Sequence, residues 1–102
     1  MKVVFLRPVK EFLNELDDSL RMDLQSLTEL LEQYGHRLSM PYAKPIGGRL
    51  WELRHTSRPS IRILYGFCDG TAVLLLAFKK QRSNLRQHNI ELALKRFNEY
   101  CA

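Results

Sequence analysis

The sequence contains only two cysteines, Cys68 and Cys101, with no CxxC motif and no histidine at a zinc-ligand spacing from either. This scarcity predicts no metal site, no disulfide framework and no bound cofactor, and it suits a protein of the reducing cytoplasm. The N-terminal apolar run is also short, with only four residues before Arg7 and Pro8. We therefore expect no signal peptide and no membrane span, which needs roughly 20 apolar residues.

Acidic residues are scarce in the last two-thirds of the chain. Residues 37–102 carry twelve lysines and arginines but only four acids, whereas residues 1–36 carry four basic residues and seven acids. The net charge of +5 therefore understates a strongly positive region. Such a field attracts polyanions and supplies phosphate contacts, so we favour a nucleic-acid partner. The alternative is a solvated surface that only keeps the protein in solution.

The length of 102 residues and the apolar pattern predict a single domain that begins with a strand at residues 2–7. Pro8 suits the first turn of a helix. Apolar residues at helical spacing then predict two amphipathic helices within residues 8–34, and Gly35 is a natural end for the second. The second helix has three suitable capping residues, Asp17, Asp18 and Ser19.

Period-two alternation predicts three antiparallel strands in the middle of the chain. Residues 36–48 contain two prolines and two adjacent glycines without periodicity, which indicates an irregular loop. Strands are expected at residues 49–55, 61–68 and 71–78, and the last two are joined by a tight turn at Asp69 and Gly70.

The C-terminal segment predicts one more helix, because its apolar residues form a single stripe of Ile90, Ala93, Leu94, Phe97 and Cys101. The order of elements predicts an α+β fold. We expect a small, twisted, mainly antiparallel sheet with an N-terminal helical pair and a C-terminal helix, all packed on one face.

Two arginines should lie together on the sheet. If the apolar residues of neighbouring strands face the helices, then Arg54 and Arg62 face the other way as cross-strand neighbours. Like charges repel there, so an anion held by both explains the pair, and guanidinium groups suit bidentate phosphate contacts. The alternatives are that Glu52 or Asp69 neutralises the arginines, or that they extend into water. We expect Arg62→Ala to leave the fold intact, since a sheet-face arginine contributes little to a core.

The densest basic cluster follows the last strand and contains Lys79, Lys80 and Arg82, with Arg86 close behind. We expect these side chains to project towards the arginine pair. Cleaving RNA requires a 2′-hydroxyl to be deprotonated, a phosphorane-like transition state to be stabilised and a 5′-oxygen to be protonated, which positioned acids, bases and cations do without metal. A lysine acts as a base only with a lowered pKa, and Lys79 has cationic neighbours.

His55 is the most interesting histidine, because it follows Arg54 at a strand end and histidine exchanges protons near neutral pH. Alternation nevertheless places it on the face of Trp51 and Leu53. A structural role is therefore favoured over a catalytic one.

Four short motifs occur in a distinctive order: LWELR at residues 50–54, RILYGF at 62–67, DG at 69–70 and FKK at 78–80. With them, nearly the whole chain resembles the RelE/ParE toxin superfamily, and in particular its HigB-related, phage-derived Gp49-like branch. The resemblance implies a small sheet backed by helices. It also implies a toxin–antitoxin toxin that cleaves messenger RNA on the ribosome and is silenced by a cognate antitoxin.

Partners implied by the resemblance are therefore the antitoxin, the ribosome and messenger RNA. The family's basic catalytic positions match Arg54, Arg62, Lys79 and Lys80, and further RNA-binding candidates are Arg49, Arg58, Arg82, Arg86 and His55. The sequence has no clear equivalent of the family's C-terminal catalytic histidine or tyrosine, since Tyr100 falls at the end of the last helix. Two alternatives therefore remain: a ParE-like gyrase inhibitor, and a non-catalytic module that binds nucleic acid or an antitoxin.

Overall fold

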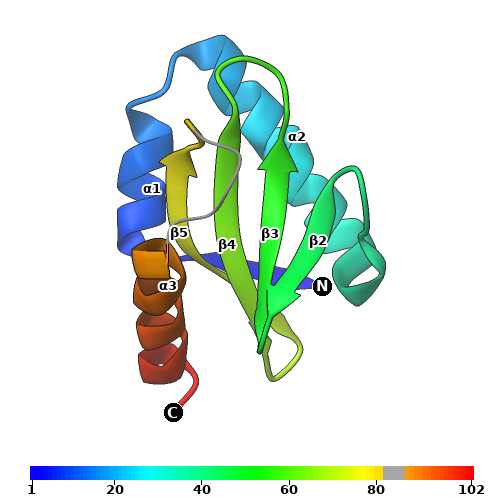
Figure 1. The fold of residues 1–102 in the computed structure, drawn as a ribbon. Coiled ribbons are helices and arrows are strands. Elements are labelled where there is room, and N and C mark those ends of the chain that lie inside the picture. Colours follow the sequence, from blue (N-terminus) through cyan, green and yellow to red (C-terminus); the bar gives the residue numbers. More distant parts are fainter. Residues whose placement is uncertain (82–86) are drawn as a thin grey trace.

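A computed structural model describes residues 1–81 and 87–102. The order of elements is β1 (Lys2–Phe5), α1 (Arg7–Asn14), α2 (Asp18–Tyr34), a 3₁₀ turn (Gly35–Arg37), β2 (Ala43–Gly47), β3 (Leu50–His55), β4 (Ile61–Cys68), β5 (Thr71–Lys79) and α3 (Gln87–Tyr100). This arrangement confirms the predicted α+β fold (Figure 1). In the described ranges, none of the helices combines the length and the apolar character of a membrane span.

The five strands form one mixed sheet in the order β1-β5-β4-β3-β2. β1 pairs in parallel with β5, and the other neighbours are antiparallel. The prediction of an irregular loop over residues 36–48 is wrong for β2, which pairs with β3. Pro45 obscured this strand in the sequence. A proline is tolerated there because β2 is an edge strand, with a register shift between Pro45 and Gly47.

Local signals set the ends of the second helix and the β4–β5 turn. The Asp17 carboxylate accepts a hydrogen bond from the Leu20 backbone N–H (2.8 Å), so Asp17 is the cap among the three candidates. Gly35 ends the helix with φ +54°, as predicted. Asp69 and Gly70 both have positive φ, 50° and 76°, which suits the predicted two-residue hairpin turn.

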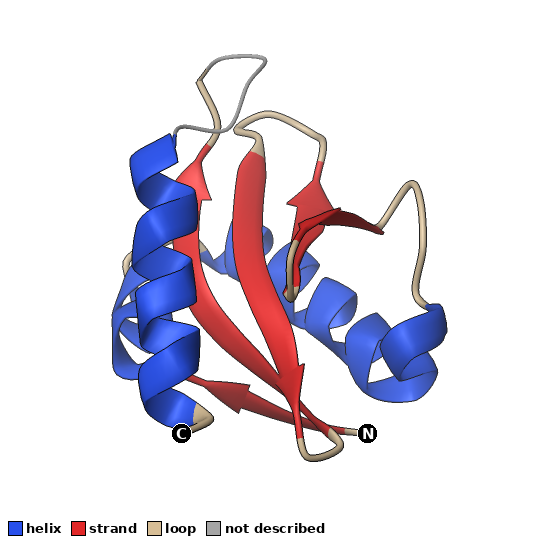
Figure 2. Ribbon diagram, turned by 60° about the horizontal axis from the view of Figure 1, so that its bottom comes forward, coloured by secondary structure: helices blue, strands red, loops and turns tan. Residues whose placement is uncertain are grey.

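Helices cover both faces of the sheet, so the prediction that all of them pack on one face is wrong (Figure 2). On one face, called here the α2 face, α1 and α2 pack over residues such as Leu53, Ile63 and Leu74. On the other, called the α3 face, Ala93 and Phe97 of α3 pack against residues that include Leu50, Leu64 and Val73. Apolar residues occur on both faces of β4 and β5, so helices can pack on each side of the sheet. The apolar stripe predicted for α3 was too wide, because it included Leu94, which is 39% exposed.

Cys68 and Cys101 form a disulfide, so the expectation from the cysteine count is wrong. Cys68 ends β4, and Cys101 directly follows α3. α3 runs antiparallel to β5 (Figure 1), and this brings the two positions to the same end of the molecule. The two cysteines are 33 residues apart in the sequence, and neither this spacing nor the composition predicts the disulfide.

Arg96 adds a polar link between α3 and the sheet that the sequence did not suggest. The register between β4 and β5 shifts at Leu64/Tyr65, which leaves Leu75 as the extra residue of a bulge. The Leu75 carbonyl accepts a hydrogen bond from Arg96 Nη1 at 2.8 Å. A bulge carbonyl that lies outside the ladder thus helps to fix α3.

Close packing of α3 on the sheet depends on Gly66. A Cβ added at this position would lie 2.7 Å from the Phe97 ring and 3.2 Å from the Arg49 carbonyl oxygen. We expect Gly66→Ala to lower the free energy of unfolding by about 2 kcal/mol, because a buried aromatic ring must move. Chemical denaturation of Gly66→Ala and of the wild type measures this difference in stability. Equal stability of Gly66→Ala and the wild type would show that α3 is not tightly seated.

Candidate nucleic-acid interface

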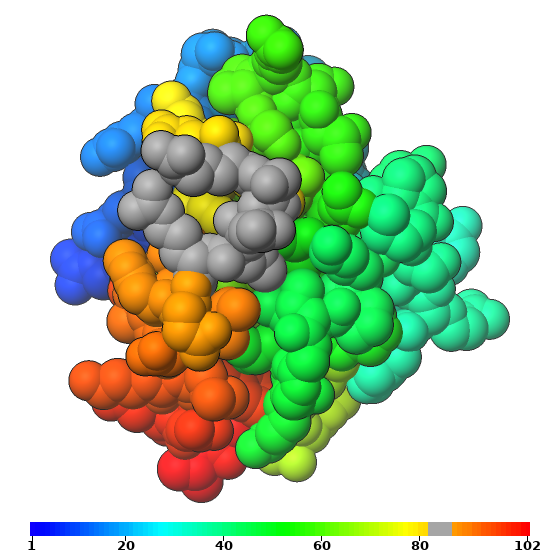
Figure 3. All heavy atoms as spheres, in the orientation of Figure 1, coloured from blue at the N-terminus to red at the C-terminus, as the bar shows by residue number. Residues whose placement is uncertain are grey.

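The cross-strand placement of Arg54 and Arg62 is confirmed. The two residues are direct partners in the β3–β4 ladder, and their apolar neighbours Leu53 and Ile63 belong to the core on the α2 face. Both arginines therefore lie on the α3 face, which Figure 3 shows with all atoms. α3 packs over Leu50 and Leu64 on this face, so the arginines share it with a covered apolar region.

Glu52 lies between these cations and is fully buried. Its Oε1 atom is 3.6 Å from Arg54 Nε, 3.7 Å from Arg62 Nε and 3.9 Å from Lys44 Nζ. Neither carboxylate oxygen has a hydrogen-bond partner among the described residues, so the attraction is mainly between charges. The interpretation that Glu52 balances the arginines is therefore partly right. One carboxylate facing three cations leaves a surplus of positive charge.

Arg62 is held rigidly by the backbone around it. It is 5% exposed, and its Nη1 donates to the carbonyl oxygens of His55 (3.0 Å) and Ile61 (3.1 Å) and to Ser60 Oγ (2.8 Å). Burial lowers its pKa from the ordinary arginine value, Glu52 opposes that shift and Arg54 adds to it. The expectation that Arg62→Ala leaves the fold intact is therefore corrected, because this side chain ties the β3–β4 connection together.

Arg54 is the more accessible member of the pair. Its side chain is 16% exposed, and its Nη1 lies 2.9 Å from Met40 Sδ. No other acceptor among the described residues takes a hydrogen bond from its guanidinium group. Arg54 is thus better placed than Arg62 to meet an anion from solution.

The two lysines after the sheet do not lie together, contrary to prediction. Lys79 pairs with Ile61, a residue of the α2-face core, so the register places Lys79 on the opposite side of the sheet from Arg62. The strand runs one residue further than predicted, and alternation therefore separates neighbouring side chains. Lys80 follows the strand, and its N–H donates to the Ser60 carbonyl oxygen (2.8 Å).

Lys80 shares its electrostatic surroundings with the arginine pair. Burial is the largest cause of a lowered pKa at its amine, and Glu52 opposes the shift. The positive charges of Arg62, Lys44 and Arg54 add to the lowering. We refer to Lys44, Arg54, Arg62 and Lys80 as the cationic cluster. Lys44 was missed in the sequence because β2 was not predicted.

His55 of β3 links the sheet to α2. Its Nε2 lies 3.1 Å from Asp23 Oδ2, and its Nδ1 lies 3.1 Å from the Pro59 carbonyl oxygen. The ring is 9% exposed and lies on the α2 face, as alternation predicted. Both ring nitrogens are therefore used by the fold, which agrees with the structural interpretation of this residue.

The remaining RNA-binding candidates are dispersed. Arg49 is exposed and holds its guanidinium 4.5 Å from the centre of the Phe97 ring, beside α3. Arg58 is exposed in the β3–β4 connection. Arg82 and Arg86 lie outside the described residues.

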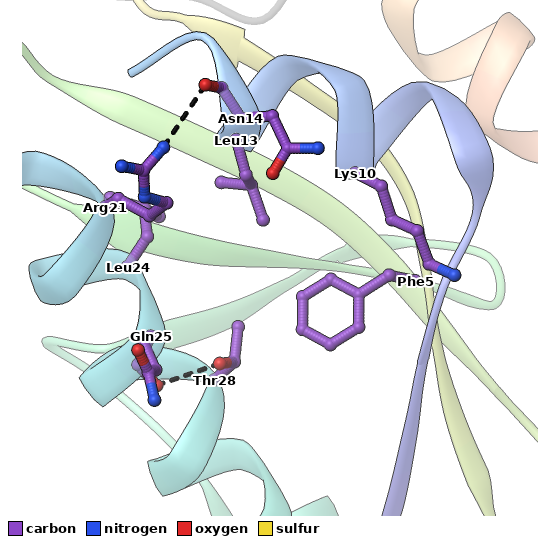
Figure 4. A pocket seen from close by; sticks show the side chains of 8 residues that line it. All are labelled: Phe5, Lys10, Leu13, Asn14, Arg21, Leu24, Gln25 and Thr28. Carbon is purple, nitrogen blue, oxygen red and sulfur yellow. Dashed lines mark hydrogen bonds between the residues drawn. The ribbon is translucent and has the colours of Figure 1, made fainter. Parts of the chain in front are cut away.

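A separate pocket of about 290 Å³ opens between α1, α2 and β1 (Figure 4). Phe5, Leu13 and Leu24 line it, and all three belong to the core on the α2 face. Arg21 at its edge already donates to the Asn14 carbonyl oxygen and pairs with Asp18. The pocket is therefore distinct from the cationic cluster. Over residues 1–81 and 87–102, no three histidine, cysteine, aspartate or glutamate side chains are grouped as metal ligands.

Comparison with known proteins gives one family. The model of the family described as phage-derived Gp49-like protein (DUF891) matches residues 11–98, which include the cationic cluster. This family is associated with RelE-like toxins, so the match indicates the toxin of a toxin–antitoxin pair and an antitoxin as its partner. None of the curated proteins matches the chain.

Proposed function

Because this chain belongs to the phage-derived Gp49-like family, we propose that it is a toxin that cleaves messenger RNA on the ribosome. The observation that carries the proposal is the cationic cluster around the buried Glu52. A fixed group of cations on a sheet face suits a phosphodiester whose negative charge increases in the transition state. The cognate antitoxin, the ribosome and messenger RNA are its proposed partners.

The described residues suggest how the chemistry is divided. Arg54 and Arg62 stabilise the pentavalent phosphorane that forms when the 2′-hydroxyl attacks the phosphate. Lys80 protonates the departing 5′-oxygen, because a lowered pKa makes its ammonium group a stronger acid. Glu52 is fully buried and therefore positions the arginines without touching the substrate. A ribosomal RNA group accepts the 2′-hydroxyl proton, which accounts for a dependence on the ribosome.

Purified protein, one messenger RNA and ribosomes are sufficient to test the proposal. We expect cleaved transcripts by primer extension when ribosomes are present and intact transcripts when they are absent. Expression in growing cells should stop growth and cut messenger RNA, and co-expression of the antitoxin should prevent both. Growth arrest with intact transcripts would contradict the proposal, and DNA-damage signalling in such cells would instead indicate a gyrase inhibitor.

A further inference from the structure

A cavity of about 360 Å³ lies at the edge of the sheet where β3 ends and β2 begins. Its wall combines Asp23, Ser26, Leu27 and Leu30 of α2 with Pro41 and Tyr42 before β2 and Thr56 and Ser57 after β3. Arg54 lines it as well, so the cavity adjoins the cationic cluster. Its volume falls in the range of sites for small organic groups.

Tyr42 and Arg54 both line this cavity, to which Tyr42 contributes an aromatic side chain. The tyrosine is 46% exposed, and its carbonyl oxygen accepts a hydrogen bond from the Arg54 backbone N–H at 2.8 Å. The contact of Arg54 Nη1 with Met40 Sδ directs the guanidinium group towards the same segment. Exposed aromatic rings next to cations are characteristic of sites for single-stranded nucleic acid, where the ring stacks on a base while the cation holds the backbone.

We propose that Tyr42 and this cavity form a nucleobase subsite, which holds the base of a single-stranded RNA nucleotide next to the phosphate bound by Arg54. The inference rests on the proposed function and adds a residue that positions the substrate. Stacking on Tyr42 tolerates any base. The hydroxyl groups of Ser26, Thr56 and Ser57 offer hydrogen bonds to the edge of a base, and they give the subsite a nucleotide preference.

The test compares cleavage of one messenger RNA in a reconstituted translation reaction by the wild type, Tyr42→Ala and Tyr42→Phe. We expect Tyr42→Ala to cut roughly 10- to 100-fold more slowly and with a broader choice of nucleotides beside the cut. Tyr42→Phe keeps the ring and should retain the wild-type rate and positions. Tyr100→Ala is the matched control, because Tyr100 is 45% exposed and ends α3 beside the disulfide, at the other end of β4 from His55.

Each outcome is decisive. Wild-type cleavage with unchanged rate and positions in Tyr42→Ala overturns the subsite and leaves the proposed function standing. Absence of cleavage by the wild type overturns both. Unchanged cleavage with weakened antitoxin binding overturns the subsite and assigns the surface to a protein partner. If thermal unfolding shows that Tyr42→Ala does not fold, Tyr42→Leu keeps the apolar bulk without the ring, and the same loss of rate and preference is expected.

Discussion

Replacing Arg54 with alanine is expected to abolish growth arrest and to slow messenger-RNA cleavage by roughly 100- to 1,000-fold. Arg54 is the accessible guanidinium group of the pair, at 16% side-chain exposure, whereas Arg62 is 5% exposed and engaged with the backbone. The stability of the variant should change little, because Glu52 keeps Arg62 and Lys44 as counter-charges. Primer extension measures cleavage, and thermal unfolding measures stability.

Arg7→Ala is the matched control for Arg54→Ala. It removes the same charge from an exposed arginine of α1, whose partner is Glu11 in the same helix. A toxic, folded Arg54→Ala variant would dismiss the cationic cluster as the site of phosphate binding. Equal loss of activity in Arg7→Ala would show that total charge, and not its position, determines activity.

Replacing Glu52 with alanine is expected to lower the free energy of unfolding by about 3 kcal/mol and to abolish cleavage as well. The substitution leaves Arg62 buried without its counter-charge and lets Arg54 and Lys44 repel it. Chemical denaturation at neutral pH measures the loss. Glu52→Gln keeps the shape without the charge, so a similar loss in this variant attributes the effect to electrostatics.

Glu11→Ala provides the surface control for this second experiment. Glu11 is exposed and pairs with Arg7 at 3.6 Å, so its loss should change stability by less than about 0.5 kcal/mol. If Glu52→Ala were as stable as Glu11→Ala, the carboxylate would not be what holds the cations together.

Much of the candidate site follows from alternation within single strands. Trp51 and Leu53 set the parity of β3, which placed Arg54 opposite Arg62. The same alternation places Glu52 on the face of Arg54, so the sequence predicts that the Glu52 carboxylate lies near the arginines. Its full burial was not predictable, because burial depends on what lies above the strand.

Features that depend on strand ends and on tertiary packing were not predictable in this way. β5 is one residue longer than predicted, so Lys79 lies on the α2 face, whereas Lys80 lies near the arginines. The side chosen by α3 could not be inferred, since β4 and β5 are apolar on both faces. The link between Cys68 and Cys101 depends on that choice.

The parallel pairing of β1 with β5 has a consequence for how the protein is made. β5 is the last strand to be synthesised, yet it lies between β1 and β4 and contributes to both cores. During synthesis, β1 therefore has no β5 to pair with until residues through Lys79 have left the ribosome. A nascent chain therefore cannot complete the sheet, or bring Lys80 to the cationic cluster, before that point.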